Sequence, residues 1–193
     1  MYETGVTRPG AMAAILGKLS DSIESLCELA TGRGLVVPAN YNTAEQIVVS
    51  GEVAGVERLM DLAKANGAKR AVRLPVSGAF HSPLMEPAVG GFTEAVNATE
   101  FAEPAFPVYS NVTEQPSSSA QNARELLIRQ LTAPVRWTGE VTNLSLAYPD
   151  ALFVEMGPGN VLTGLLTRIV PAAKGIACGT PADVDKLINQ LTG

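Results

Sequence analysis

Short apolar segments and amphipathic segments follow one another in a fixed order over residues 10–76, and this order constrains the fold more than any other feature. The apolar segments are typical of buried strands, and the amphipathic segments repeat their apolar residues at helical spacing. The predicted strands are residues 10–17, 34–41, 46–51 and 69–76. The predicted helices begin at Ser20 and at Glu52, and Gly67 ends the second one. The predicted order is therefore β-α-β-β-α-β.

The second and third predicted strands are expected to pair with each other. Only residues 42–45 separate them, and two strands so close in sequence most easily form a hairpin. The complete order is that of the ferredoxin-like arrangement. We therefore predict an α+β subdomain of this kind in the first part of the chain.

After His81 the pattern changes to strands that alternate with helices. The predicted helices are residues 87–98, 117–131, 138–148, 159–170 and 181–191, and the predicted strands are residues 107–111, 151–156 and 175–178. Alternation at this spacing implies parallel β-α-β units with both faces of the sheet covered. Because three short strands are few for a free-standing sheet, we expect this half to be part of a larger sheet.

Composition and charge exclude several classes of protein. The 193 residues are 46% hydrophobic and 17% charged, which excludes a disordered tail, and a net charge of −5 argues against a nucleic-acid partner. We expect no membrane span, because no run of about 18 uncharged apolar residues occurs, and no secretory signal at the start. The two cysteines, Cys27 and Cys178, fit a cytoplasmic location and are expected in the core. A single histidine cannot form a His-rich zinc site, so we predict no metal site.

His81 is the residue best suited to acid–base chemistry. It follows the fourth predicted strand among small residues, and its ordinary pKa lies near neutrality. The alternative is a partly buried histidine with a structural role only. A nucleophile serving His81 should lie on a strained turn such as G-x-S-x-G. The sequence contains no such motif, so we expect that nucleophile to lie outside this chain.

Other polar positions leave two interpretations open. Asn40 and Asn42 either cap a turn or line a cleft. The segment 156–160 (MGPGN) is either a plain connecting turn or a helix N-terminus that faces an anion. Gln130, in a last helical turn, is either solvated or in contact with free carbonyl groups. No G-x-G-x-x-G or G-x-x-x-x-G-K-[ST] motif supports a nucleotide site.

Five segments that cover nearly the whole chain occur in the order and at the spacing of one known family. They are PGAMAAILG (9–17), VVPANYNTAEQIVVSG (36–51), GAKRAVRLPVSGAFHSPLM (67–85), LIRQLTAPVRW (127–137) and FVEMGPGNVLTGLLTRI (153–169). Together they resemble the malonyl-CoA:acyl-carrier-protein transacylases and the acyltransferase domains of polyketide synthases.

The resemblance implies a large α/β-hydrolase-like subdomain with a ferredoxin-like small subdomain inserted in it. Residues 8–82 would be the small subdomain, and residues 83–193 would be the C-terminal half of the large one. The family's N-terminal part carries a GQGSQ loop, the nucleophile serine of GHSLGE, and an arginine that pairs with the malonyl carboxylate. None of these occurs here, so we expect a truncation, an internal start or one piece of a split gene.

The resemblance also implies roles for individual residues. His81 matches the histidine that activates the family's serine and then protonates the leaving thiol. Gln130 matches the position whose backbone carbonyl orients that histidine. Phe80 resembles the bulky residue that disfavours methylmalonyl groups, and Asn40 and Asn42 match positions in the cleft. The turn residues Gly157, Gly159 and Asn160 match a turn beside the family's active site.

The function implied is ping-pong transfer of malonyl from malonyl-CoA to the serine, and then to the phosphopantetheine thiol of acyl carrier protein. The expected partners are malonyl-CoA, acyl carrier protein and, for a split gene, a separate N-terminal chain that supplies the serine. No cofactor of its own is expected. Without the serine, we expect this chain to be inactive alone. The alternative is an inactive fragment that acts as a binding module for carrier protein or for a partner chain.

Overall fold

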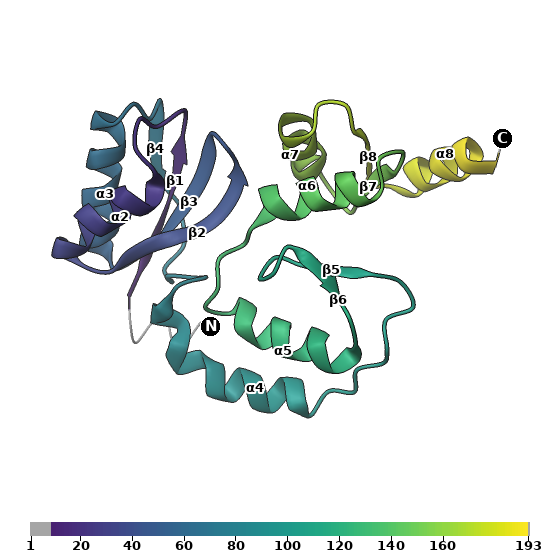
Figure 1. The fold of residues 1–193 in the computed structure, drawn as a ribbon, viewed down its shortest axis with the longest axis horizontal. Coiled ribbons are helices and arrows are strands. Elements are labelled where there is room, and N and C mark those ends of the chain that lie inside the picture. The colour runs from purple at the N-terminus through teal and green to yellow at the C-terminus, as the bar shows by residue number, and fades with distance from the viewer. Residues whose placement is uncertain (1–8, 193) are drawn as a thin grey trace. The chain divides into compact units, whose positions relative to one another are not determined.

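The computed structural model describes residues 9–192 of a mixed α/β protein. The chain divides into two compact units, Met1–Glu140 and Val141–Gly193, and Figure 1 follows it through both. The predicted subdomain boundary at residue 82 lies within the first unit. That boundary stays a prediction.

The first unit begins with the six elements that the sequence predicts, in the predicted order. They are β1 (Ala11–Leu16), α2 (Ile23–Ala30), β2 (Val36–Thr43), β3 (Gln46–Gly51), α3 (Val53–Ala65) and β4 (Arg70–Arg73), with a short 3-10 turn, η1 (Thr31–Arg33), after α2. The four strands form one sheet in the order β2-β3-β1-β4. Every neighbouring pair is antiparallel, and β2 and β3 form the predicted hairpin.

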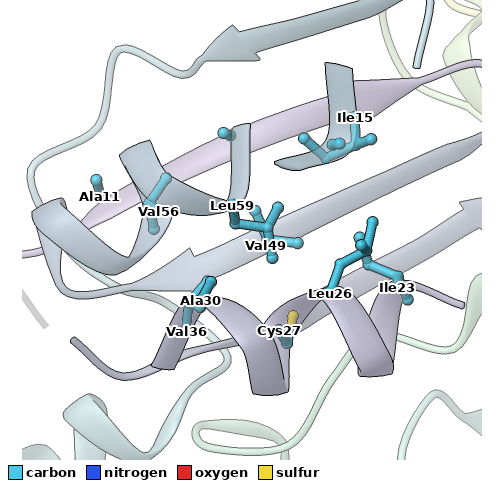
Figure 2. Close-up of a cluster of buried hydrophobic side chains, with 12 residues drawn as sticks. Ala11, Ile15, Ile23, Leu26, Cys27, Ala30, Val36, Val49, Val56 and Leu59 are labelled. Atoms are coloured by element: carbon cyan, nitrogen blue, oxygen red, sulfur yellow. The ribbon is translucent and has the colours of Figure 1, made fainter. Parts of the chain in front are cut away.

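The sheet and its two helices enclose the main hydrophobic core. Figure 2 shows side chains of α2 and α3 gathered against side chains of β1, β2 and β3. The fully or almost fully buried members include Ile15, Leu26, Val49, Val56 and Leu59. Cys27 belongs to this cluster, and both cysteines are free and buried, as predicted. The helices thus cover one face of the sheet. The predicted catalytic residues, His81 and Gln130, lie outside these six elements.

Helix α2 begins later than the sequence analysis predicts. Its N-cap is Ser22, whose hydroxyl accepts a hydrogen bond from the Ser25 N–H at 3.2 Å. Ser20 does not open the helix, because the Ser20 and Asp21 N–H groups both donate to the side-chain oxygen of Asn66, at 3.0 and 2.8 Å. These bonds hold both residues outside the helix, against the end of α3.

The rest of the first unit ends in a helix, α5, that carries the predicted site residue Gln130. This part of the unit consists of the 3-10 turn η2 (Pro83–Ala88), α4 (Val89–Asn97), β5 (Val108–Ser110), β6 (Gln115–Ser117) and α5 (Ala120–Gln130). The prediction of parallel pairing is wrong for β5, which pairs antiparallel with β6, a strand that the sequence analysis missed. A tight turn with Glu114 at φ 59° joins the two strands. Helix α5 starts after the N-cap Ser119 and ends at Gln130.

The second unit contains the predicted β-α-β pattern. Helix α6 (Trp137–Ala147) contains the unit boundary, and β7 (Leu152–Met156), α7 (Val161–Ile169), β8 (Lys174–Cys178) and α8 (Pro181–Thr192) follow. Strands β7 and β8 pair in parallel, as alternation with a helix predicts. None of the helices within residues 9–192 is both long and apolar enough to cross a membrane.

Candidate functional site

The loop that follows β4 carries His81, and it stays close to the start of β1. Leu74 donates its N–H to the Met12 carbonyl at 2.8 Å, and Gly10 donates its N–H to the Ser77 carbonyl at 3.2 Å. Gly10 has no Cβ, and a Cβ there would lie 2.6 Å from the side chain of Ala79. The loop therefore packs directly on the backbone of Gly10.

Phe80 packs against the sheet immediately before His81. The half-buried ring lies against a second cluster of buried side chains formed by Met12, Ala39 and Val48. These three residues come from β1, β2 and β3, so the centre of the sheet supports the ring. The position of Phe80 is thus determined by apolar packing on the sheet.

His81 makes the contact that defines the site. Its Nδ1 lies 3.1 Å from the backbone oxygen of Gln130, a residue 49 positions further along the chain. Because a carbonyl oxygen only accepts hydrogen bonds, this contact favours the neutral ring with its proton on Nδ1. Nε2 is then the ring atom with a lone pair that can take a proton. The two predicted catalytic residues are thus in direct contact.

Gln130 lies at the end of α5, where backbone carbonyl groups lack partners within the helix. Its side-chain Nε2 donates to the carbonyl oxygens of Ala133 and Pro134, at 2.9 and 3.3 Å. These bonds fold the segment after α5 back on the helix end. The sequence analysis expected a side chain that is solvated or in contact with free carbonyl groups, and the structure shows contact with two carbonyl groups just beyond the helix.

The same segment joins the site to strand β2. The Val135 N–H donates to the Ala39 carbonyl at 2.8 Å, and the Tyr41 N–H donates to the Val135 carbonyl at 2.9 Å. Val135 thus forms a parallel bridge with Asn40. Thr138 adds a hydrogen bond from its hydroxyl to the Tyr41 carbonyl at 2.9 Å. The residues after Gln130 therefore lie along the edge of the sheet.

Asn40 and Asn42 are half-buried residues of β2. The strand is irregular at both, with shifts in register between Pro38 and Asn40 and between Tyr41 and Thr43. The bridge to Val135 connects Asn40 to the segment that starts at Gln130. The role of either side chain in binding stays a prediction.

A small cavity beside Gln130 escaped the sequence analysis. It has a volume of about 200 Å³ and is lined mainly by apolar residues of β5 and α5, among them Tyr109, Leu126 and Leu127. Asn111 also lines it, and its side-chain oxygen is buried with no hydrogen-bond partner among the described residues. The signal in the sequence was Asn111 itself, an asparagine at the end of the predicted strand 107–111.

The turn residues Gly157, Gly159 and Asn160 lie between β7 and α7, in the second unit. Gly157 and Gly159 have φ angles of 122° and 105°, which favour glycine. The Glu155 carboxylate accepts the N–H groups of Leu162 and Thr163 at the start of α7, at 3.1 and 2.8 Å.

A hydrogen bond from the Thr163 hydroxyl at 2.7 Å, together with these two backbone bonds, lowers the pKa of the Glu155 carboxyl. The two backbone bonds also occupy the helix donors that an anion would need. The structure therefore favours a plain connecting turn over an anion site at these donors, and a place for the turn beside His81 stays a prediction.

Burial raises the pKa of several side chains. Burial raises the pKa of the Cys27 thiol to about 12, so this group is not a reactive thiolate. Burial and a hydrogen bond to Glu24 raise the pKa of Tyr41. Burial and the charge of Glu114 raise the pKa of Glu140. Among residues 9–192, no three histidine, cysteine or carboxylate side chains gather closely enough to hold a metal ion.

Known proteins resemble this chain over nearly its whole length. The family model described as "Acyl transferase domain" matches residues 2–180. A malonyl CoA-acyl carrier protein transacylase of Bacillus subtilis is 41% identical over 192 residues, which are 99% of this chain and 60% of that protein. The chain thus spans about 60% of the length of this curated relative.

Solved structures agree with the sequence comparison. An acyl-carrier-protein S-malonyltransferase from Bartonella henselae superimposes with a TM-score of 0.90 at 37% identity, over 96% of this chain and 59% of that one. A malonyl-transacylase solved in complex with its type II polyketide-synthase acyl-carrier protein gives a TM-score of 0.88 at 38% identity, over 94% of this chain and 59% of that one.

Proposed function

The chain belongs to the acyl transferase domain family, and we propose that it supplies the histidine of an enzyme that transfers malonyl from malonyl-CoA to acyl carrier protein. The names of its relatives, malonyl CoA-acyl carrier protein transacylases, support this substrate and this partner. The observation that carries the proposal is the contact between His81 Nδ1 and the Gln130 carbonyl. That contact leaves Nε2 as the proton acceptor.

We propose that the chain has the two-subdomain arrangement that the family resemblance implies. Residues 8–82 correspond to a ferredoxin-like small subdomain, which the sheet order β2-β3-β1-β4 supports. Residues 83–193 correspond to the C-terminal part of an α/β-hydrolase-like subdomain. The parallel pair β7 and β8, joined by α7, supports this assignment.

In the first half-reaction, a serine hydroxyl attacks the thioester carbonyl of malonyl-CoA while His81 Nε2 accepts the hydroxyl proton. The carbon–sulfur bond then breaks, and the imidazolium returns its proton to the sulfur of coenzyme A. A malonyl ester remains on the serine. The Gln130 carbonyl holds the ring in the tautomer that this step requires, as the third member of a triad does.

In the second half-reaction, the phosphopantetheine thiol of acyl carrier protein attacks the malonyl ester. His81 Nε2 accepts the thiol proton and passes it to the serine oxygen as the ester bond breaks. The products are the malonyl thioester of the carrier protein and the free serine. Neither half needs a cofactor of this chain, because phosphopantetheine belongs to the carrier protein.

The remaining predicted residues would shape the acyl pocket. Phe80 precedes the imidazole, and its packing on the sheet leaves it little freedom to move. Its ring would crowd the α-methyl of a methylmalonyl group. Asn40 and Asn42 would contribute to the walls of the cleft. The role that the family resemblance implies for Gly157, Gly159 and Asn160 stays a prediction.

A second candidate function is a binding module for the carrier protein or for a partner chain. It is favoured by one observation, the absence of a G-x-S-x-G motif from the 193 residues. In neither candidate does this sequence carry the nucleophile. They differ in whether His81 acts on a nucleophile supplied from outside it or the chain only binds its partner.

Labelled malonyl-CoA separates the candidates. The chain is incubated alone, mixed with the N-terminal portion of the Bacillus subtilis relative, and fused to that portion, and each sample is analysed for covalent label. We expect label only where the GHSLGE serine is present, and its loss in His81→Ala. The matched control is Ser77→Ala, which removes an exposed hydroxyl from the same loop and should retain the label.

Three results would change the proposal. Label on the chain alone would contradict a nucleophile outside it. Undiminished labelling in the His81→Ala fusion would contradict the role of the imidazole. An unlabelled fusion that still binds acyl carrier protein would favour the binding module instead.

A further inference from the structure

His81 is carried on backbone that a residue with a Cβ rarely adopts. Its φ angle is 55°, in the left-handed region. Such a conformation is strained for a residue with a Cβ and persists only where surrounding contacts determine it. The contacts that hold this backbone therefore also decide where the imidazole points.

Ser82, the next residue, makes two such contacts. Its hydroxyl donates to the Ala79 carbonyl at 2.6 Å and accepts the Leu84 N–H at 3.3 Å. The two partners lie on either side of His81 in sequence, so one hydroxyl fastens the backbone before the imidazole to the backbone after it. The Ser82 side chain is fully buried, with no exposed surface. Water therefore cannot replace these bonds.

Both ends of this turn are fixed by other elements. On one side, Ala79 packs against Gly10, where a Cβ would collide with it at 2.6 Å. On the other side, the Ser82 carbonyl accepts the Met85 N–H at 3.0 Å as η2 begins. Met85 is 1% exposed, so this end is anchored in the core. Ser82 thus closes a short turn between two anchored points, with His81 at its apex.

We propose that Ser82 is a positioning residue, whose hydroxyl holds the backbone of His81 so that Nδ1 meets the Gln130 carbonyl and Nε2 stays available. An alanine at position 82 leaves the Ala79 carbonyl and the Leu84 N–H buried without this partner. The turn then relaxes toward an ordinary φ angle, and the ring leaves Gln130. The catalytic consequence rests on the proposed function, whereas the effect on the ring does not.

The single histidine of the chain makes the ring directly observable, since nitrogen-15-labelled histidine reports one imidazole in the whole 193-residue protein. In the unaltered chain we expect one tautomer with the proton on Nδ1. In Ser82→Ala we expect a mixture of tautomers. The matched control, Ser77→Ala, removes an exposed hydroxyl of the same loop and should leave the spectrum unchanged.

A folded Ser82→Ala chain with the unaltered tautomer would overturn the proposal. Should Ser82→Ala fail to fold, Ser82→Cys is read in the same way, because a thiol of similar size is a weak donor and acceptor. We expect a partial change in its ring spectrum, and an unchanged spectrum would also overturn the proposal.

Activity provides a separate readout in the fusion that carries the GHSLGE serine. There we expect Ser82→Ala to lower kcat roughly tenfold to a hundredfold through misplacement of the ring, with KM within about twofold. If the unaltered fusion transfers no malonyl, the proposed function fails. The tautomer measurement still decides whether Ser82 positions His81.

Discussion

The side-chain amide of Gln130 should stabilise the first unit whether or not the protein is catalytically active. It donates to Ala133 and Pro134, at 2.9 and 3.3 Å, and so ties the end of α5 to the segment that reaches β2. The substitution Gln130→Met keeps the length and the helix propensity of the side chain but removes both donors. The two carbonyl groups then lose their partner.

The expected loss follows from the two hydrogen bonds. Each contributes a net 0.5–1.5 kcal/mol, and the longer one should lie at the low end, so the free energy of unfolding should fall by about 1.5–2 kcal/mol. The control Gln121→Met removes an amide from the same helix whose bond, to Glu125 at 2.7 Å, is exposed to solvent. That control should cost less than about 0.5 kcal/mol.

Amide hydrogen exchange locates the effect. The Val135 N–H, bound to Ala39, and the Tyr41 N–H, bound to Val135, both depend on the segment after Gln130. Their exchange should accelerate by about tenfold to thirtyfold, since each 1.4 kcal/mol is a factor of ten. The Leu74 N–H, bound to Met12, should exchange as before. Equal destabilisation by Gln130→Met and Gln121→Met, or unchanged exchange at Val135, would refute this reasoning.

Three further predictions, one of them with a control substitution, test other parts of the account. Phe80→Ala in the malonyl-transferring fusion should raise the kcat/KM ratio of methylmalonyl-CoA to malonyl-CoA by about 10–200-fold, and a constant ratio would exclude Phe80 from specificity. Gly10→Ala should destabilise the chain by about 1–3 kcal/mol in urea titration, because its Cβ meets the loop of His81 at 2.6 Å. Gly32→Ala, which meets no atom within 4 Å, should be within about 0.5 kcal/mol of the unaltered chain. Burial and Glu114 raise the pKa of Glu140 in the folded state, so its ionisation weakens the fold as the pH rises above the ordinary glutamate pKa. Glu140→Gln should therefore gain stability relative to the unaltered chain at pH 8 but not at pH 4, and a pH-independent difference would contradict this sign.

Local patterns predicted the first six elements because each depends mainly on nearby residues. The apolar run of β1 and the helical spacing of α3 determine their own structure, and Gly67 follows α3 as expected. The start of α2 was wrongly predicted at Ser20. The bond that holds Ser20 outside the helix comes from Asn66, 46 positions away, and a local pattern does not reveal it. Strand β6 was missed because its three residues include a proline and owe their pairing to the turn at Glu114.

The candidate site was only partly predictable for the same physical reason. His81 was identified by its own chemistry and by its place after a strand. Its partner Gln130 came only from the family resemblance, since no spacing rule relates residues 49 positions apart. The buried hydroxyl of Ser82 had no signal at all, because a serine after a loop histidine is ordinary in sequence. Its significance depends on the φ angle of His81 and on two backbone partners.

The rate of the first acylation step tests the central claim most directly. A rapid-quench measurement on the fusion would follow labelled malonyl as it moves from coenzyme A to the serine. The account predicts that His81→Ala slows this step by about 10²–10⁴-fold, because the serine then lacks its proton acceptor. An equal acylation rate in the fusion and in its His81→Ala variant would contradict the account.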